Sequence, residues 1–213
     1  MNAVADPREY RPAVGSHGGR VVLVTGAGDG IGRAVSLALA AQGATVGLLG
    51  KTQRKLEAVY DQIVAADHPR PALLPFNLET ATANEYDALH AALAAEFGRL
   101  DGLAHIAGIL GSRSPLEHYD VPTWCRVLHV NLTAAFILTQ ATLPLLKQSE
   151  DASVVFTSSG VGRRSLTWKS AVTVHGGVSR PRDRIRCQAA VQLEWQSRSA
   201  PLLPPLSIPG KAS

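Results

Sequence analysis

A glycine-rich turn between an apolar run and a helical pattern constrains this chain more than any other feature of its sequence. Val21–Val24 is a short run of apolar residues, as a strand buried on both faces requires. Thr25–Gly32 then places four glycines in eight residues, and a helical apolar pattern runs from Arg33 to Gly43, a residue type common at helix C-termini. A strand, a glycine turn and a helix in this order form the first half of a nucleotide-binding βαβ unit.

The spacing of these glycines is typical of a phosphate-binding turn. Gly26, Gly30 and Gly32 give the pattern T-G-x-x-x-G-I-G, whereas the commoner G-x-G-x-x-G fails because Ile31 stands where its third glycine belongs. Backbone N–H groups at the start of a helix attract phosphate, and a Cβ in the turn would keep a pyrophosphate from approaching. The alternative is a glycine turn in an ordinary α/β protein, and the flanking strand and helix argue against it.

The rest of the apolar pattern predicts an α/β protein with a doubly wound parallel sheet. Further strands are predicted at Ala44–Leu49, Ala72–Phe76, Leu100–Ile106 and Ser153–Thr157, and helices at Thr52–Ala66, Asn84–Phe97 and about Pro122–Lys147. Strands that alternate with helices imply a parallel sheet with helices on both faces. We expect a polar lead-in over residues 1–19, one nucleotide-binding domain over 20–159 and a different segment over 160–213.

The charge of the chain is concentrated in that last segment. Residues 160–213 hold nine Lys and Arg against two acids, although the whole chain has a net charge of only +4. The segment also has five prolines and no sustained apolar period, so we expect a disordered or poorly packed basic tail. Without covering elements from this tail, the strand Ser153–Thr157 would be an exposed apolar edge, and the 213-residue chain would aggregate or unfold in part.

The cysteine count and the hydropathy of the chain indicate in which cellular compartment it is expected. Cys125 and Cys187 provide no disulfide framework, so a reducing cytoplasm is expected. No apolar run reaches membrane-spanning length and the N-terminus has no signal-peptide pattern, so we expect no membrane partner. No metal site is predicted.

Several motifs together resemble one family. Residues from about Arg20 to Gly162 are similar to the short-chain dehydrogenase/reductase (SDR) family, in particular its YciK-like bacterial branch. The resemblance lies in the glycine turn Thr25–Gly32, in Leu100-Asp-Gly102, in Val130-Asn131 and in Val155–Ser159, in the order that the family has them. It covers about two thirds of the chain.

The resemblance implies a nicotinamide cofactor and assigns residues to its site. Thr25, Gly26, Gly30, Ile31 and Gly32 match the cofactor-binding turn, and Ala107 and Gly108 match the end of the family's N-A-G motif beside the cofactor. The Asn of that motif is replaced by Ile106, which removes a side chain that ties neighbouring strands in the family.

Two further residues match the family's catalytic group. Asn131 corresponds to the Asn that supports a water-linked proton relay, and Ser159 to the Ser that hydrogen-bonds the substrate carbonyl. Either residue has an alternative: an Asn within a helix can bond locally, and a Ser at a strand end is common in loops.

The identity of the cofactor depends on the end of the second strand. An acidic residue there binds the NAD ribose, whereas a basic residue suits the 2′-phosphate of NADP. Leu48–Lys51 has no carboxylate, and Lys51 is placed to meet a phosphate, so the sequence favours NADP(H) over NAD(H). Against this, Asp29 in the glycine turn would repel a nearby phosphate, and Lys51 could equally be an ordinary solvated lysine.

The resemblance fails at the proton donor. The family places a Tyr about thirteen residues after the Ser and a Lys four residues later, but these positions hold Val172 and Gly176, and no tyrosine follows Ser159. We therefore expect an SDR-like oxidoreductase that transfers hydride between NADP(H) and a carbonyl or alcohol, impaired in this chain, for instance by a frameshift. The alternatives are a catalytically dead nucleotide-binding protein and, last, a basic-tailed protein that binds anionic partners such as nucleic acid. Expected partners are a small-molecule substrate and a second copy through the helix 122–147, while nucleic acid is not favoured.

Overall fold

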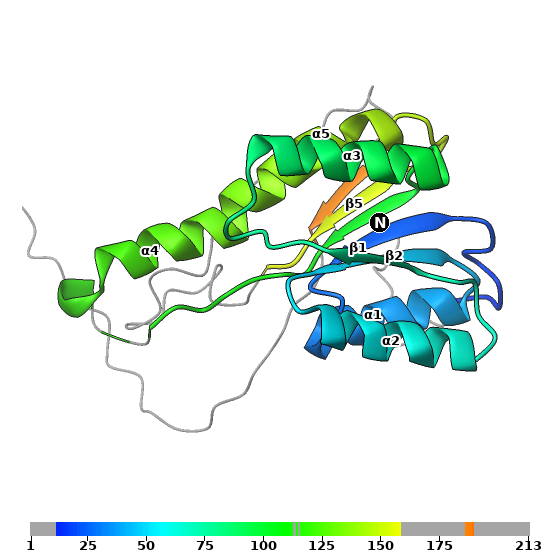
Figure 1. The fold of residues 1–213 in the computed structure, drawn as a ribbon, viewed down its shortest axis with the longest axis horizontal. Coiled ribbons are helices and arrows are strands. Elements are labelled where there is room, and N and C mark those ends of the chain that lie inside the picture. Colours follow the sequence, from blue (N-terminus) through cyan, green and yellow to red (C-terminus); the bar gives the residue numbers. More distant parts are fainter. Residues whose placement is uncertain (1–11, 113, 115, 159–185, 190–213) are drawn as a thin grey trace, which may run out of the picture.

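Six parallel strands form one sheet in the computed structural model, which describes residues 12–112, 114, 116–158 and 186–189 (Figure 1). The strands, in chain order, are β1 (Val21–Thr25), β2 (Thr45–Gly50), β3 (Ala72–Pro75), β4 (Gly102–His105), β5 (Ser153–Phe156) and β6 (Arg186–Ala189). Their order across the sheet is β3-β2-β1-β4-β5-β6, and every neighbouring pair is parallel. The predicted parallel, doubly wound sheet is confirmed.

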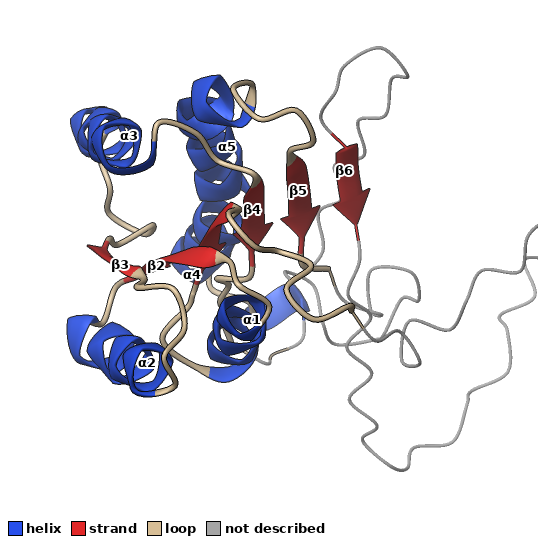
Figure 2. Cartoon of the chain, turned by 90° about the vertical axis from the view of Figure 1, so that its right-hand side faces the viewer, coloured by secondary structure: helices blue, strands red, loops and turns tan. Residues whose placement is uncertain are grey.

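Helices cover both faces of this sheet. The helical segments are α1 (Gly30–Ala41), α2 (Gln53–Ala65), α3 (Ala83–Phe97), the 3-10 turn η1 (Leu116–His118), α4 (Val121–Leu128), the π-helical segment η2 (His129–Thr133) and α5 (Ala134–Leu146). Figure 2 shows α1 and α2 on one face of the sheet and α3 and α5 on the other. Successive residues of β1 pack on opposite faces of the sheet. Val22 and Val24 belong to the core beside α1 and α2, and Leu23 belongs to the core beside α3 and α5.

The ends of α1 follow from two residues of its sequence. The helix starts at Gly30 rather than at Arg33, because the Asp29 carboxylate caps it by accepting a hydrogen bond of 2.7 Å from the Gly30 N–H. At the other end Gly43 adopts a φ of +89°, and the N–H groups of Gly43 and Ala44 donate to carbonyls in the last turn of α1. This is a Schellman motif, and it confirms the predicted role of Gly43.

The helix predicted over about 122–147 is one continuous helical stretch with an irregular middle. Between α4 and α5 the five residues of η2 form a π-helix, which sequence periodicity did not predict. Segments of this kind are frequent at functional sites because they re-aim a side chain, and η2 contains Asn131.

This stretch also bears on the expectation about hydropathy. Val121–Leu146 is, by length and composition alone, long and apolar enough to cross a membrane, with a mean hydropathy of 1.2 in its most apolar window. This finding does not decide whether the helix meets a membrane, and the expectation of no membrane partner stays a prediction. The core helix of a globular domain has the same composition, and α5 buries Leu138 and Leu146 completely against the sheet.

The edge predicted at β5 is also corrected. The four residues of β6 pair with β5 in parallel register, from Ser153 opposite Arg186 to Phe156 opposite Ala189, so β5 has neighbours on both sides. The segment 160–213 thus supplies one strand, and its remaining predictions, together with those for the lead-in before residue 12, lie outside the described residues. Aggregation of the chain stays a prediction, although an unpaired β5 is no longer its reason.

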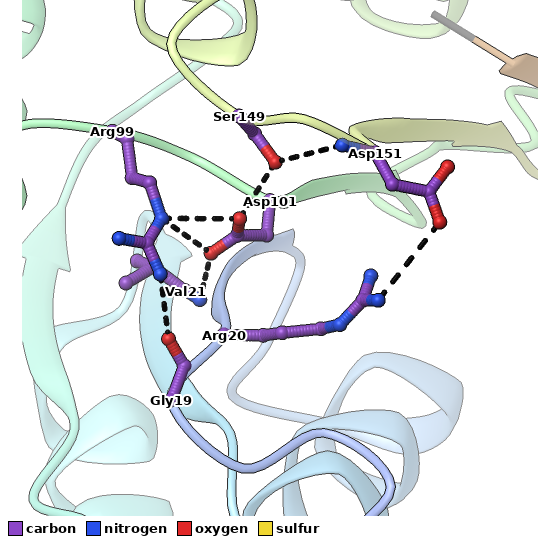
Figure 3. Close-up of polar contacts among 7 residues, drawn as sticks. All are labelled: Gly19, Arg20, Val21, Arg99, Asp101, Ser149 and Asp151. Carbon is purple, nitrogen blue, oxygen red and sulfur yellow. Dashed lines mark hydrogen bonds and ion pairs between the residues drawn. The ribbon is translucent and has the colours of Figure 1, made fainter.

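A buried carboxylate joins the amino ends of β1 and β4 (Figure 3). Asp101 accepts hydrogen bonds of 2.8 Å from the Val21 N–H and 2.7 Å from the Ser149 hydroxyl, and it pairs with the Arg99 guanidinium at 3.2 Å. Arg99 in turn donates to the Gly19 carbonyl at 2.9 Å. The network fixes the two central strands at the edge opposite the glycine turn.

Candidate functional site

The site lies where the strand order reverses, between the carboxyl ends of β1 and β4. Thr25 ends β1 and is buried, with its hydroxyl donating to the Ala104 carbonyl at 3.3 Å. The same oxygen accepts from the N–H groups of Ile106 at 2.9 Å and Ala107 at 3.0 Å. Thr25 therefore ties the two strand ends together, although Ile106 replaces the Asn that has this task in the family.

The glycine turn is shaped by close backbone approaches. Gly26 has a φ of +67°, and a Cβ there would lie 3.0 Å from the Cα of Ala107. A Cβ at Gly32 would lie 2.1 Å from the Gly26 carbonyl oxygen, so this position admits no side chain. A Cβ at Gly30 would meet nothing within 4 Å. Gly26 and Gly32 thus build the turn, whereas a side chain at Gly30, the first residue of α1, would point into open space at the helix N-terminus, the kind of place where phosphates bind.

A cleft of about 270 Å³ adjoins this turn. Its lining comes from the glycine turn, the carboxyl ends of β2 and β3, the start of α2, the loop after β4, and η2. Four predicted residues line it, namely Gly26, Lys51, Ala107 and Gly108. Thr25, Gly30, Ile31 and Gly32 belong to the turn and the first turn of α1 without lining the cleft.

The loop after β3 lines the cleft and was missed by the sequence analysis. Phe76, Asn77, Leu78 and Glu79 follow β3 directly and line the cleft together with residues of the glycine turn. The available signal was topological, because the carboxyl ends of neighbouring parallel strands meet at one edge of the sheet. Lys55 of α2 and Ile109 of the loop after β4 line the cleft as well and were also missed.

Both carboxylates of the cleft are paired with cations. Asp29 accepts from Lys55 Nζ at 2.5 Å, and this hydrogen bond, with that from the Gly30 N–H, holds the pKa of Asp29 below its usual value. Glu79 pairs with Arg126 of α4 through contacts of 2.6 and 3.2 Å, and the hydrogen bond from Arg126 likewise lowers the pKa of Glu79. Within the described part of the chain, no carboxylate forms an ion pair with Lys51.

Asn131 is held by the loop after β4. Its side-chain nitrogen donates to the Ile109 carbonyl at 2.8 Å, and its oxygen accepts from the Ile109 N–H at 2.9 Å. A Cβ at Gly108 would lie 3.3 Å from that oxygen, so a larger residue there would require Asn131 to shift by a few tenths of an ångström. The alternative that this Asn bonds within its own helix is wrong, and its part in a proton relay stays a prediction. Ser159, the other predicted catalytic residue, lies outside the described residues.

The residues that form the cleft fit a dinucleotide. The glycine turn leads into a helix N-terminus, a lysine follows β2 where a 2′-phosphate would be met, and the loop after β3 lines the same cleft. Within the described residues, no group of three or more His, Cys, Asp or Glu side chains could hold a metal ion.

Comparison with known proteins agrees with this geometry. Residues 20–172 match the short chain dehydrogenase family. The uncharacterised oxidoreductase YciK of Escherichia coli K12 is 42% identical over 155 residues, which are 73% of this chain and 62% of that protein. The chain thus spans less than two thirds of the length of this relative.

Solved structures give the same result. A short chain dehydrogenase from Pseudomonas syringae is 51% identical, with a TM-score of 0.74 over 76% of this chain and 66% of its own. Another from Escherichia coli CFT073, solved in complex with NADPH, is 42% identical, with a TM-score of 0.70 over 72% of this chain and 64% of its own. With its glycine turn, its sheet order and these relatives, the chain belongs to the short chain dehydrogenase family.

Proposed function

We propose that this chain carries the cofactor-binding part of an oxidoreductase that interconverts a carbonyl and an alcohol with NADP(H). The observation that carries the proposal is the open glycine turn beside a cleft that contains Lys51 and no carboxylate at the end of β2. A bound NADP(H) supplies or accepts the hydride. The NADPH complex of a relative from Escherichia coli CFT073 supports the choice of NADP(H) over NAD(H).

Four residues in and around the cleft have distinct tasks in this proposal. The Gly26 and Gly32 backbones let the turn approach the pyrophosphate, which the N-terminus of α1 attracts. Lys51 supplies the charge for the 2′-phosphate. Asn131 fixes the Ile109 backbone through two hydrogen bonds, and so holds the loop that lines the cleft opposite β2.

Turnover requires a proton donor in addition to the cofactor. Reduction of a carbonyl leaves an alkoxide that must be protonated, and the family resemblance assigns that proton to a Tyr assisted by a Lys. Val172 and Gly176 stand at those positions. This observation favours a second candidate, a nucleotide-binding protein without catalysis, and we expect the chain to bind NADPH with little or no reduction of aldehydes and ketones.

The experiment compares valine substitutions at two glycines that both have a positive φ, so that each variant carries the same kind of backbone strain. Gly30 and Gly98 both have positive φ values, +48° and +69°, and a Cβ at either meets nothing within 4 Å, but only Gly30 belongs to the glycine turn. In a fluorescence titration, Gly30→Val is expected to weaken NADPH binding by about tenfold or more, since its side chain occupies the approach to the α1 N-terminus. Gly98→Val should leave the affinity unchanged. Equal NADPH affinity in the two variants, both with a native circular dichroism spectrum, would refute the proposed site.

The predicted homo-oligomer remains open to test. Val121, Leu132 and Phe136, which are 68%, 38% and 63% exposed on the stretch from α4 to α5, are the large apolar side chains that a second copy would cover. The small-molecule substrate and the cytoplasmic location likewise stay predictions.

A further inference from the structure

The ion pair between Asp29 and Lys55 lies in the cleft, at the edge of the glycine turn. Asp29 precedes the first residue of α1, and Lys55 is in the first turn of α2, 26 residues later. Both side chains are exposed, at 73% for Asp29 and 55% for Lys55, and both residues line the cleft together with Lys51. The pair therefore borders the space in which the proposed cofactor binds.

The placement of Lys55 depends on the turn itself. A Cβ at Gly28 would lie 2.9 Å from the Cβ of Lys55, so α2 packs directly against the turn and only a glycine fits between them. The stem of Lys55 is therefore fixed beside the turn, and its ammonium group reaches Asp29 at 2.5 Å. By contrast, Arg33 of α1 donates to Gln62 at 2.6 Å and forms no ion pair with a described residue.

A bare carboxylate at this place would oppose the binding of NADP(H). Asp29 belongs to the same turn that would meet the pyrophosphate, and a negative charge there repels phosphate groups. A 2′-phosphate adds about two negative charges that NAD(H) lacks, so the repulsion would weaken NADP(H) more than NAD(H). Because Asp29 is also the cap of α1, its side chain cannot simply turn away without loss of that hydrogen bond.

We propose that Lys55 is a specificity-determining residue that neutralises Asp29, so that Lys51 can select the 2′-phosphate. The inference rests on the proposed function. Glu79, which also lines the cleft, repeats the arrangement, because Arg126 engages both of its oxygens. The cleft thus has two carboxylates, each with its own cation, and Lys51 remains as the cation available to the cofactor.

The test is a double-mutant cycle read by cofactor binding. Dissociation constants for NADPH and NADH are measured by fluorescence titration for the parent chain, Lys55→Met, Asp29→Asn and the double variant, with Arg54→Met as a control for loss of an exposed cation from α2. Lys55→Met is expected to weaken NADPH about threefold to fivefold with little effect on NADH, as fits an exposed charge interaction. The double variant should return to within about twofold of the parent, and added salt should shrink the effect of Lys55→Met.

The outcomes separate this inference from the proposed function. If Lys55 touches the phosphate itself, the double variant will bind NADPH as weakly as Lys55→Met, and the neutralising role is refuted. Equal weakening of NADPH and NADH by Lys55→Met would also overturn it, because the residue would then only support the packing of α2. A parent chain that binds neither cofactor overturns both the proposed function and the inference, whereas a parent that prefers NADPH with unchanged preference in Lys55→Met overturns the inference alone.

Discussion

Lys51 is the single side chain on which the choice between the two cofactors depends most directly. It follows β2 in the cleft, and Glu79, which lines the same cleft, is already engaged by Arg126. Lys51→Glu is expected to weaken NADPH binding by about tenfold or more and NADH binding much less, because attraction to the 2′-phosphate becomes repulsion. Arg54→Glu makes the same change of charge on an exposed position of α2 outside the cleft and should alter neither constant. Equal losses for both cofactors would show that Lys51 is only a surface charge.

His105 makes the stability of the protein depend on pH. It ends β4, is 6% exposed, and its ring stacks on Phe156 at 4.7 Å between centroids. The Thr139 hydroxyl donates to the Ala135 carbonyl, so the 2.9 Å contact with His105 is a hydrogen bond from Nε2–H to the hydroxyl oxygen. Burial lowers the pKa of His105 from 6.5 to about 4, so the folded chain holds this histidine neutral.

The sign of the resulting pH dependence follows from the lowered pKa. Between pH 6.5 and about 4 the unfolded chain binds a proton that the folded chain excludes, so stability falls as the pH falls through this window. The loss amounts to about 3 kcal/mol when the window has been crossed. In urea unfolding, His105→Gln should remove this part of the pH dependence, whereas His118→Gln, at an exposed position of η1, should retain it. An unchanged pH profile in His105→Gln would contradict the assignment.

At the scale of elements, Asp101 joins β1 to β4 through the network of Figure 3. Its burial opposes ionisation, but hydrogen bonds from Ser149, the Val21 N–H and Arg99 outweigh burial and lower the pKa of Asp101. Its contribution is therefore present above the unfolded pKa of 3.8 and is lost as the pH falls through the lower folded pKa.

Asp101→Ala is expected to destabilise the fold by about 1.5–3 kcal/mol, the usual range for a hydrogen-bonded charged group, since it leaves the Val21 N–H without its partner. Asp151→Ala is the matched control, because that carboxylate is 66% exposed and meets Arg20 only at 3.9 Å. It should change the free energy of unfolding by about 1 kcal/mol or less. Chemical denaturation gives the free energy of unfolding of both variants. Equal losses in the two would mean that the network contributes no more stability than a surface ion pair.

Some of these elements could be predicted from the sequence, whereas contacts between distant residues could not. The apolar runs of β1 and β2 and the glycine turn are local patterns, and the structure has them within a residue or two of the predicted bounds. The hydrogen bonds that hold Asn131 in the π-helical segment were not predicted, because their partner Ile109 lies 22 residues away. The pairing of Asp29 with Lys55 was missed for the same reason, and Asp29 was therefore read as a charge that acts alone.

For the whole molecule, the sheet brings separate segments of the chain to one edge. The glycine turn, Lys51, the loop after β3 and Asn131 come from elements far apart in sequence, and they meet only because neighbouring strands are parallel. The strand β6 is the sixth strand of the sheet and lies beside β5. The local sequence patterns did not predict it, since the segment 160–213 has no sustained apolar period of its own.

The measurement that tests this account most directly is the pair of dissociation constants of the full 213-residue chain for NADPH and NADH. A fluorescence titration of the purified protein gives both under one set of conditions. The account predicts saturable binding of one NADPH per chain, several-fold tighter than that of NADH, because the open glycine turn accepts the pyrophosphate and Lys51 attracts the 2′-phosphate. Absence of saturable NADPH binding by the folded chain, or binding of NADH as tight as that of NADPH, would contradict it.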